Sequence, residues 1–97
     1  MSNILFSQEA ESDYLESLRW YAARSKTAAI NFEFFVNQAM IAIAADPFRY
    51  PKCDERHHYY LLKRFPFQII YRILHNDECL VVAIAHTSRE PGYWSER

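Results

Sequence analysis

The sequence has 97 residues, of which 51% are hydrophobic, 24% charged and 16% aromatic, and it contains a single glycine. A chain this rich in apolar side chains can offset its ordering entropy by burial, which excludes disorder and collagen-like repeats. At this length roughly 60 to 70% of the unfolded surface is buried on folding, which is enough for one core. We therefore expect residues 1–97 to form a single domain.

The formal net charge is −1, so the molecule as a whole has no long-range attraction for nucleic acid or anionic membranes. The charge is uneven, because residues 1–48 hold three cations and six acids, whereas residues 49–97 hold eight cations and six acids. If a polyanion or an acidic partner is bound, the C-terminal half is the expected surface.

Two features bear on the cellular compartment. The two cysteines, Cys53 and Cys79, are too few for a disulfide framework, and Met1 leads directly into a short apolar patch at 4–6 without a signal peptide. We expect the longest mostly apolar stretch to be 80–85, which is far shorter than the roughly 20 residues needed to span a bilayer. We expect a cytoplasmic protein with no membrane partner.

The N-terminal half predicts a short strand at 4–6 and a helix that begins after Ser7. Ser7 can cap the helix, and Glu9 and Glu11 stand in the first turn, where the helix dipole favours acids. Apolar side chains then recur at helical spacing until the polar segment 24–27 interrupts them: Ala10, Tyr14, Leu18 and Tyr21.

A second helix is predicted before Asp46, because the residue that precedes Pro47 is disfavoured in helical geometry. Its apolar residues fall on one face and are interpreted as core rather than as a ligand site: Phe32, Phe35, Val36, Ala39, Met40 and Ile43. The short link between the two helices predicts an antiparallel hairpin.

The C-terminal half is rich in aromatic and β-branched residues and predicts strands at 58–63, 67–74 and 79–85. Asn76 and Asp77 suit a tight turn, and the stretch 80–84 is apolar on both faces, as in a central strand covered on both sides. The order β-α-α-β-β-β predicts an α+β fold with a helical hairpin packed on a small, mostly antiparallel, twisted sheet.

The segment after the last strand, 86–94, carries the side chains best suited to chemistry. RNA cleavage by a 2′-hydroxyl needs a base, an acid and cations that stabilise the phosphoryl centre. His86 could be the base or the acid, Tyr93 the acid, and the cations could come from Arg64, Arg72 or Arg89. The alternative is structural: His86 as a hydrogen-bonding residue, and Tyr93 and Trp94 as residues that hold the C-terminus on the core.

Other candidate sites are incomplete. Cys53 and His57, with His58 beside them, supply at most half of a zinc site, so we expect no metal and no cofactor. A single glycine excludes a glycine-rich phosphate loop. Four acids on the first helix are interpreted as a solvated face that could also receive a basic partner segment: Glu9, Glu11, Asp13 and Glu16.

Two segments carry a family resemblance: RFPFQIIYR at 64–72 and VVAIAHTSREPGYW at 81–94. Both resemble the RelE/ParE superfamily of toxins from type II toxin–antitoxin modules, in particular its plasmid-stabilisation, ParE-like branch. Trp20 and Tyr21 at the end of the first helix, and the Pro47, Tyr50 and Pro51 pattern, also stand where this family places them.

The resemblance implies one of two activities, because one branch cuts messenger RNA on the ribosome and the other poisons DNA gyrase. RelE-like ribonucleases carry an arginine directly after the aromatic residue that opens the middle strand, and this chain has Gln68 there. They also place basic residues on the preceding strand, where Tyr59 and Leu61 now stand. An uncharged amide cannot supply the fixed positive charge that a phosphoryl transition state requires.

The sequence therefore favours a ParE-like toxin that binds a cellular protein, DNA gyrase, and is neutralised by a cognate antitoxin lying in a groove or along a sheet edge. The residues expected to bind the target are Arg64, Arg72, Arg89, Tyr93 and Trp94. One alternative is a ribosome-dependent mRNA endoribonuclease that uses His86, Arg89 and Tyr93. Another is an inactive, toxin-derived binding domain.

Overall fold

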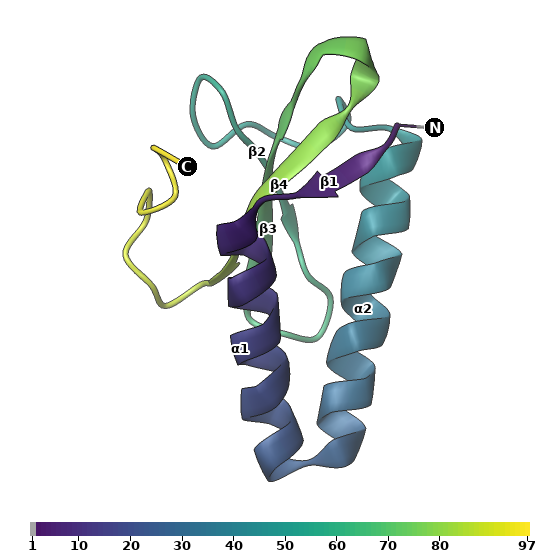
Figure 1. Ribbon diagram of the computed structural model, residues 1–97, viewed down its shortest axis with the longest axis vertical. Helices are drawn as coiled ribbons and strands as arrows, with labels where there is room; N and C mark the ends of the chain where they lie inside the picture. Colours follow the sequence, from purple (N-terminus) through teal and green to yellow (C-terminus); the bar gives the residue numbers. More distant parts are fainter. Residues whose placement is uncertain (1) are drawn as a thin grey trace.

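The computed structural model describes residues 2–97, which form a four-stranded sheet with two helices against it (Figure 1). The strands are β1 (Ile4–Phe6), β2 (His58–Leu61), β3 (Phe67–Ile73) and β4 (Cys79–His86), and they lie in the order β1-β4-β3-β2. The helices α1 (Gln8–Arg24) and α2 (Lys26–Ala45) follow β1, and a 3-10 turn, η1 (His75–Asp77), joins β3 to β4. The α+β class and the element order are as predicted.

The helical hairpin is closed by one residue. Ser7 caps α1 as expected, because its hydroxyl accepts a hydrogen bond from the Ala10 N–H at 3.0 Å. Ser25 ends α1 and begins α2, since its N–H donates to the Tyr21 carbonyl and its hydroxyl accepts from the Ala28 N–H. The polar segment 24–27 was expected to separate the two helices, but the non-helical link is Ser25 alone, because one serine caps both helix ends.

The apolar length of α2 corrects one expectation. By length and composition alone α2 could cross a membrane, so 80–85 is not the longest mostly apolar stretch. The same criterion is met by helices in the cores of folded proteins, and here six side chains of α2 are buried: Ala29, Phe32, Val36, Ala39, Ile43 and Ala44. Asp46 follows α2 as its C-cap, as the adjacent Pro47 predicts.

The sheet is mixed. β1 runs parallel to β4, and β3 is antiparallel to both β2 and β4. The pairing of β3 with β4 shifts register between Ile70, opposite Ala83, and Tyr71, opposite Val81, which leaves an extra residue in β4. The β3–β4 turn has Asn76 and Asp77 at φ 61° and 60°, the left-handed geometry expected for these residue types.

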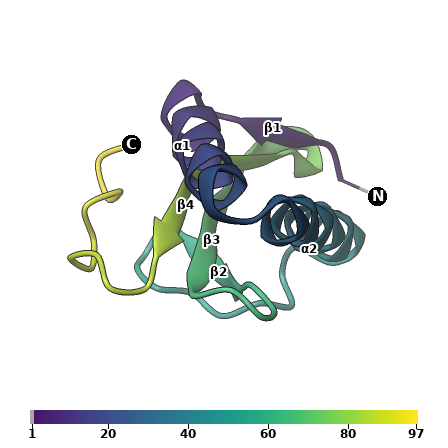
Figure 2. The ribbon, with the colours of Figure 1, turned by 90° about the horizontal axis from the view of Figure 1, so that it is seen from below.

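Both faces of the sheet are covered. The helices and the sheet share one cluster of buried side chains, which includes Phe32, Ile69 and Tyr71. The opposite face has a smaller cluster, in which Trp94 packs with Ile70, Val82, Ala83 and Ala85. The C-terminal segment 87–97 therefore forms a third layer, and it lies across the sheet from α2 (Figure 2). We name this segment the tail.

Asp13 corrects the interpretation of the acidic helix face. Its carboxylate is mostly buried, accepts a hydrogen bond from the Ile84 N–H at 3.1 Å, and pairs with Arg97 at 2.8 Å. Glu9, Glu11 and Glu16 are exposed, as expected. The basic segment received by this face is the end of the same chain, because Arg97 also donates to the Val82 carbonyl at 3.0 Å.

Candidate functional site

A cleft of about 580 Å³ lies where the second half of α1 meets the ends of β3 and β4. Trp20 stands at the cleft with 53% of its surface exposed. The other lining residues are Glu16, Ser17, Tyr21, Pro66, Phe67, His86, Ser88 and Arg89. The cleft thus combines an apolar surface with one imidazole, one guanidinium and one carboxylate.

Local structure brings these residues together. Glu16, Ser17, Trp20 and Tyr21 fall within two turns of α1, and neighbours three and four positions apart share a face. Phe67 opens β3 opposite His86, the last residue of β4. The Thr87 N–H donates to the Pro66 carbonyl at 2.8 Å, and this bond fixes the point at which the tail leaves the sheet.

The imidazole of His86 has a defined orientation. Its Nδ1 accepts a hydrogen bond from the Ser88 N–H at 3.1 Å and lies 2.7 Å from the Ser88 hydroxyl oxygen. The ring meets Phe67 edge to face, with centroids 5.0 Å apart. Because Nδ1 is an acceptor in this arrangement, a neutral His86 carries its proton on Nε2, the nitrogen that remains for a partner.

The guanidinium of Arg89 lies 4.0 Å from the centre of the Tyr93 ring, and Arg97 lies 5.0 Å from the same ring. The Tyr93 hydroxyl is buried and has no hydrogen-bond partner among residues 2–97. Burial, followed by the negative charge of Asp13, raises the pKa of Tyr93 above its ordinary value. A buried phenol with a raised pKa is a poor proton donor for a substrate, whereas its ring is well placed to support Arg89.

The other residues expected at the target surface lie elsewhere. Arg64 sits 5.6 Å from the ring centre of Phe35 on α2, and its φ of 66° places it in the left-handed region. Arg72 is half-buried in β3, with its Nε enclosed and unpaired within the described chain. Trp94 is only 6% exposed. Of the five residues, only Arg89 lines the cleft. The ring of Tyr93 contacts Arg89 but is not itself among the lining residues.

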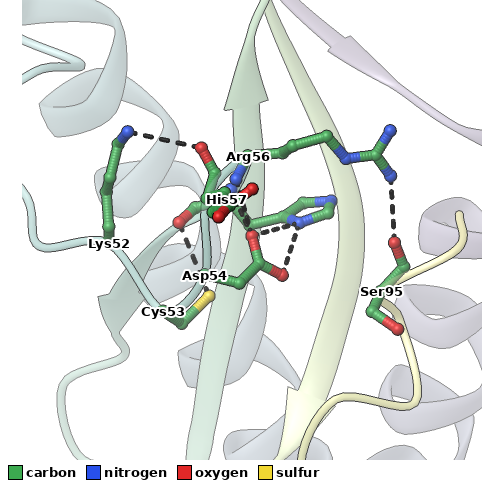
Figure 3. A network of polar contacts seen from close by, with 7 residues as sticks. Lys52, Cys53, Asp54, Arg56, His57 and Ser95 are labelled. Carbon is green, nitrogen blue, oxygen red and sulfur yellow. Dashed lines mark hydrogen bonds and ion pairs between the residues drawn. The ribbon is translucent and has the colours of Figure 1, made fainter.

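The loop before β2 and the tail are joined by a separate polar network (Figure 3). His57 is fully buried, and its Nδ1 lies 2.9 Å from both carboxylate oxygens of Asp54. Burial acts to raise the pKa of Asp54, but hydrogen bonds from the N–H groups of Arg56 and His57 and from the His57 ring outweigh it and lower the pKa. Arg56 donates to the Ser95 carbonyl at 3.0 Å, which ties the tail to this loop.

The residues considered for a metal are used for structure. The Cys53 thiol contacts the His57 carbonyl at 3.6 Å, and His58 Nδ1 lies 2.8 Å from the Tyr50 carbonyl oxygen. Within residues 2–97 no group of three or more histidine, cysteine or acidic side chains could hold a metal ion. Their hydrogen bonds position the loop rather than a ligand.

Sequence reasoning identified His86 and Arg89 but did not assign Glu16, Ser17, Trp20 and Tyr21 to the same site. The sequence signal for this part of the site was the adjacent aromatic pair Trp20 and Tyr21. In the structure the indole of Trp20 is exposed, whereas the ring of Tyr21 is half-buried and packs on Phe32 and Phe67. The first half of the chain, through α1, meets the second half at the cleft because of the order of strands in the sheet. The apolar periodicity of α1 does not predict that order.

The family model for the ParE toxin of the type II toxin–antitoxin system parDE matches residues 4–91. This chain belongs to the ParE toxin family. A solved structure described as a chromosomal ParDE toxin–antitoxin system from P. aeruginosa has the same fold, with a TM-score of 0.74 and 16% sequence identity. The alignment covers 91% of this chain and 98% of that one. Among curated proteins, none gave a significant match.

Proposed function

We propose that this ParE-family toxin arrests growth by binding a cellular protein, DNA gyrase, and that a cognate antitoxin neutralises it in the cytoplasm. The observation that carries the proposal is the makeup of the cleft. Trp20 is 53% exposed and lines the same cleft as Arg89, and tryptophan and arginine are the side chains that most often dominate protein–protein binding energy.

The electrostatics of the cleft support binding over RNA scission. Arg89 is the one cation among the lining residues within 2–97, and it is accompanied by the carboxylate of Glu16. A scission site must instead stabilise a highly charged phosphoryl centre with several cations. Gln68 leaves the arginine position of the related ribonucleases uncharged, and the hydroxyl of Tyr93 is enclosed.

The five residues expected to bind the target receive different roles in this proposal. Arg89 contacts the target directly, together with Trp20. Tyr93 and Trp94 act as positioning residues, since the ring of Tyr93 supports Arg89 and Trp94 anchors the tail on the sheet. For Arg64 and Arg72, contact with the target stays a prediction.

Binding of purified gyrase to the purified toxin tests this proposal. We expect Trp20→Ala to weaken binding by roughly 30-fold, because an anchoring tryptophan contributes about 2 kcal/mol or more. Phe34→Ala is the matched control, because Phe34 is 52% exposed on α2 and lies outside the cleft. If the toxin does not bind gyrase, the proposed target is wrong. If both variants lose the same amount of affinity, the cleft is not the binding surface.

The endoribonuclease alternative is favoured because His86 and Arg89 line one cleft, and the Ser88 N–H donates to Nδ1 of His86 rather than to Nε2. It predicts transcripts cut at defined positions in a translating extract, and a loss of cutting in His86→Ala. The third alternative, an inactive binding domain, predicts normal growth of cells that express the chain without the neighbouring gene.

A further inference from the structure

A second groove, of about 480 Å³, lies at the β2 edge of the sheet. We name it the β2 groove. One lining residue comes from α2, three from the loop after it, and four from β2 and the residues that follow: Ala42, Arg49, Tyr50, Pro51, Tyr59, Tyr60, Leu61 and Lys63. The cleft described above shares none of these residues.

The outer side of β2 is paired along only part of its length. The Tyr59 N–H donates to the Pro51 carbonyl at 3.0 Å, so the segment 51–53 covers the first residues of β2. The Leu62 N–H donates to the Phe67 carbonyl at 2.9 Å, toward β3. Because pairing alternates along an antiparallel strand, the N–H and C=O of Leu61 point outward, beyond the covering segment.

The exposed side chains at this edge favour an acidic partner. Arg49 and Lys63 are both exposed, and none of the described lining residues is acidic. The ion pairs within residues 2–97 are His57–Asp54 and Arg97–Asp13, so neither cation is neutralised by the chain itself. Leu61, at 61% exposure, adds an apolar contact beside these charges.

The aromatic side chains favour a peptide over a single-stranded nucleic acid. The rings of Tyr50 and Tyr60 pack edge to face with centroids 5.0 Å apart, and both pack against the helix-side core. Tyr59 packs against the cluster on the opposite face of the sheet. Base stacking needs open ring faces, whereas an outward N–H and C=O at a strand edge are what an added strand uses.

We propose that the β2 groove binds an extended, acidic segment of a protein partner, which adds a strand at Leu61 and places carboxylates against Arg49 and Lys63. This inference rests on the proposed function, in which that partner is the antitoxin. It names the surface on this chain and the chemistry of the bound segment.

The test uses the full chain co-purified with the protein encoded by the adjacent reading frame. Hydrogen exchange at the Leu61 amide is expected to slow at least tenfold in the complex. Leu61→Pro should weaken the complex at least tenfold, because proline removes the outward N–H without removing a bond to β3. Leu61→Ala, which keeps the N–H, should weaken it less.

Charge reversal tests the electrostatic part. Arg49→Glu and Lys63→Glu should each weaken the complex at least tenfold at low salt, with a smaller effect at high salt. Lys26→Glu is the control, because it makes the same charge change at the exposed start of α2, outside the groove.

The outcomes separate this inference from the proposed function. A complex that leaves exchange at Leu61 unchanged and tolerates Leu61→Pro overturns the inference, while growth arrest and its reversal by the neighbouring protein still test the toxin–antitoxin pairing. The absence of a complex overturns both the antitoxin partnership and the groove assignment. A single-stranded oligonucleotide that protects Leu61 when the neighbouring protein does not would also overturn the inference.

Discussion

Asp13 joins three parts of the chain through a single carboxylate oxygen. Its Oδ2 accepts from the Ile84 N–H in β4 and from Arg97 at the end of the tail, while its backbone lies in α1. In the sequence it cannot be distinguished from Glu9 and Glu11, which precede it on the same helix. Ser7 could be predicted as a cap because its partner is three residues away, but the partners of Asp13 are 71 and 84 residues away.

Removal of the Asp13 carboxylate should therefore destabilise the fold. We expect Asp13→Ala to lower the free energy of unfolding by about 1 to 3 kcal/mol, because it leaves a strand N–H and a guanidinium without their acceptor. Urea denaturation measures the change. Glu11→Ala, at an exposed position of the same helix, should cost less than about 1 kcal/mol. Equal losses would contradict the role assigned to Asp13.

Tyr71 makes the fold sensitive to alkaline pH. Its side chain is fully buried, its hydroxyl donates to the Pro47 carbonyl at 2.6 Å, and burial raises its pKa far above the ordinary value for tyrosine. The unfolded phenol loses its proton near pH 10 while the folded one keeps it. The contribution of Tyr71 to the free energy of unfolding is therefore fully present below pH 10 and is lost as the pH rises beyond it. The slope of unfolding free energy against pH should become shallower in Tyr71→Phe. If the slope is unchanged in Tyr71→Phe, the alkaline loss of stability comes from groups other than Tyr71.

At the scale of elements, Ser25 connects the two helices without a loop. The hydroxyl that caps α2 and the N–H that caps α1 belong to one residue, so the hairpin angle depends on this position. We expect Ser25→Ala to lower the free energy of unfolding by about 1 kcal/mol, through loss of the bond to the Ala28 N–H. Ser25→Asp should retain most of the stability, since aspartate is also a good cap. Thermal unfolding of the three proteins compares them directly.

The tail is the element that the sequence described least well. Trp94 could be interpreted either as a target-binding side chain or as an anchor, because its type fits both roles. The structure places it at 6% exposure against the outer face of β3 and β4, where Arg56 and Arg97 also hold the neighbouring backbone. The apolar run at 80–84 did predict that both faces of β4 would be covered, but it did not indicate what covers the second face.

Two tryptophans allow a matched test of the tail. Trp94→Ala should lower the free energy of unfolding by about 3 to 5 kcal/mol, because it removes the largest side chain of the outer cluster. Trp20→Ala should change it by less than about 1 kcal/mol, since Trp20 is 53% exposed. If the two variants unfold at the same denaturant concentration, the tail does not stabilise the sheet as described.

At the scale of the whole molecule, the family follows from motifs and fold, but the target depends on the surface. The segments 64–72 and 81–94, which carry the resemblance, build most of β3, most of β4 and most of the tail of this chain. The cleft depends on Trp20 from one half of the chain and Arg89 from the other. A linear motif cannot report that juxtaposition, which is why the cleft emerged only from the structure.

A toxin that binds DNA gyrase and a toxin that cuts RNA give opposite results in one pair of assays. A single preparation of toxin is titrated into gyrase supercoiling reactions and into ribosomes translating a defined transcript. We expect supercoiling to be inhibited while the transcript stays intact. Cleaved transcripts with supercoiling unaffected at saturating toxin would contradict it.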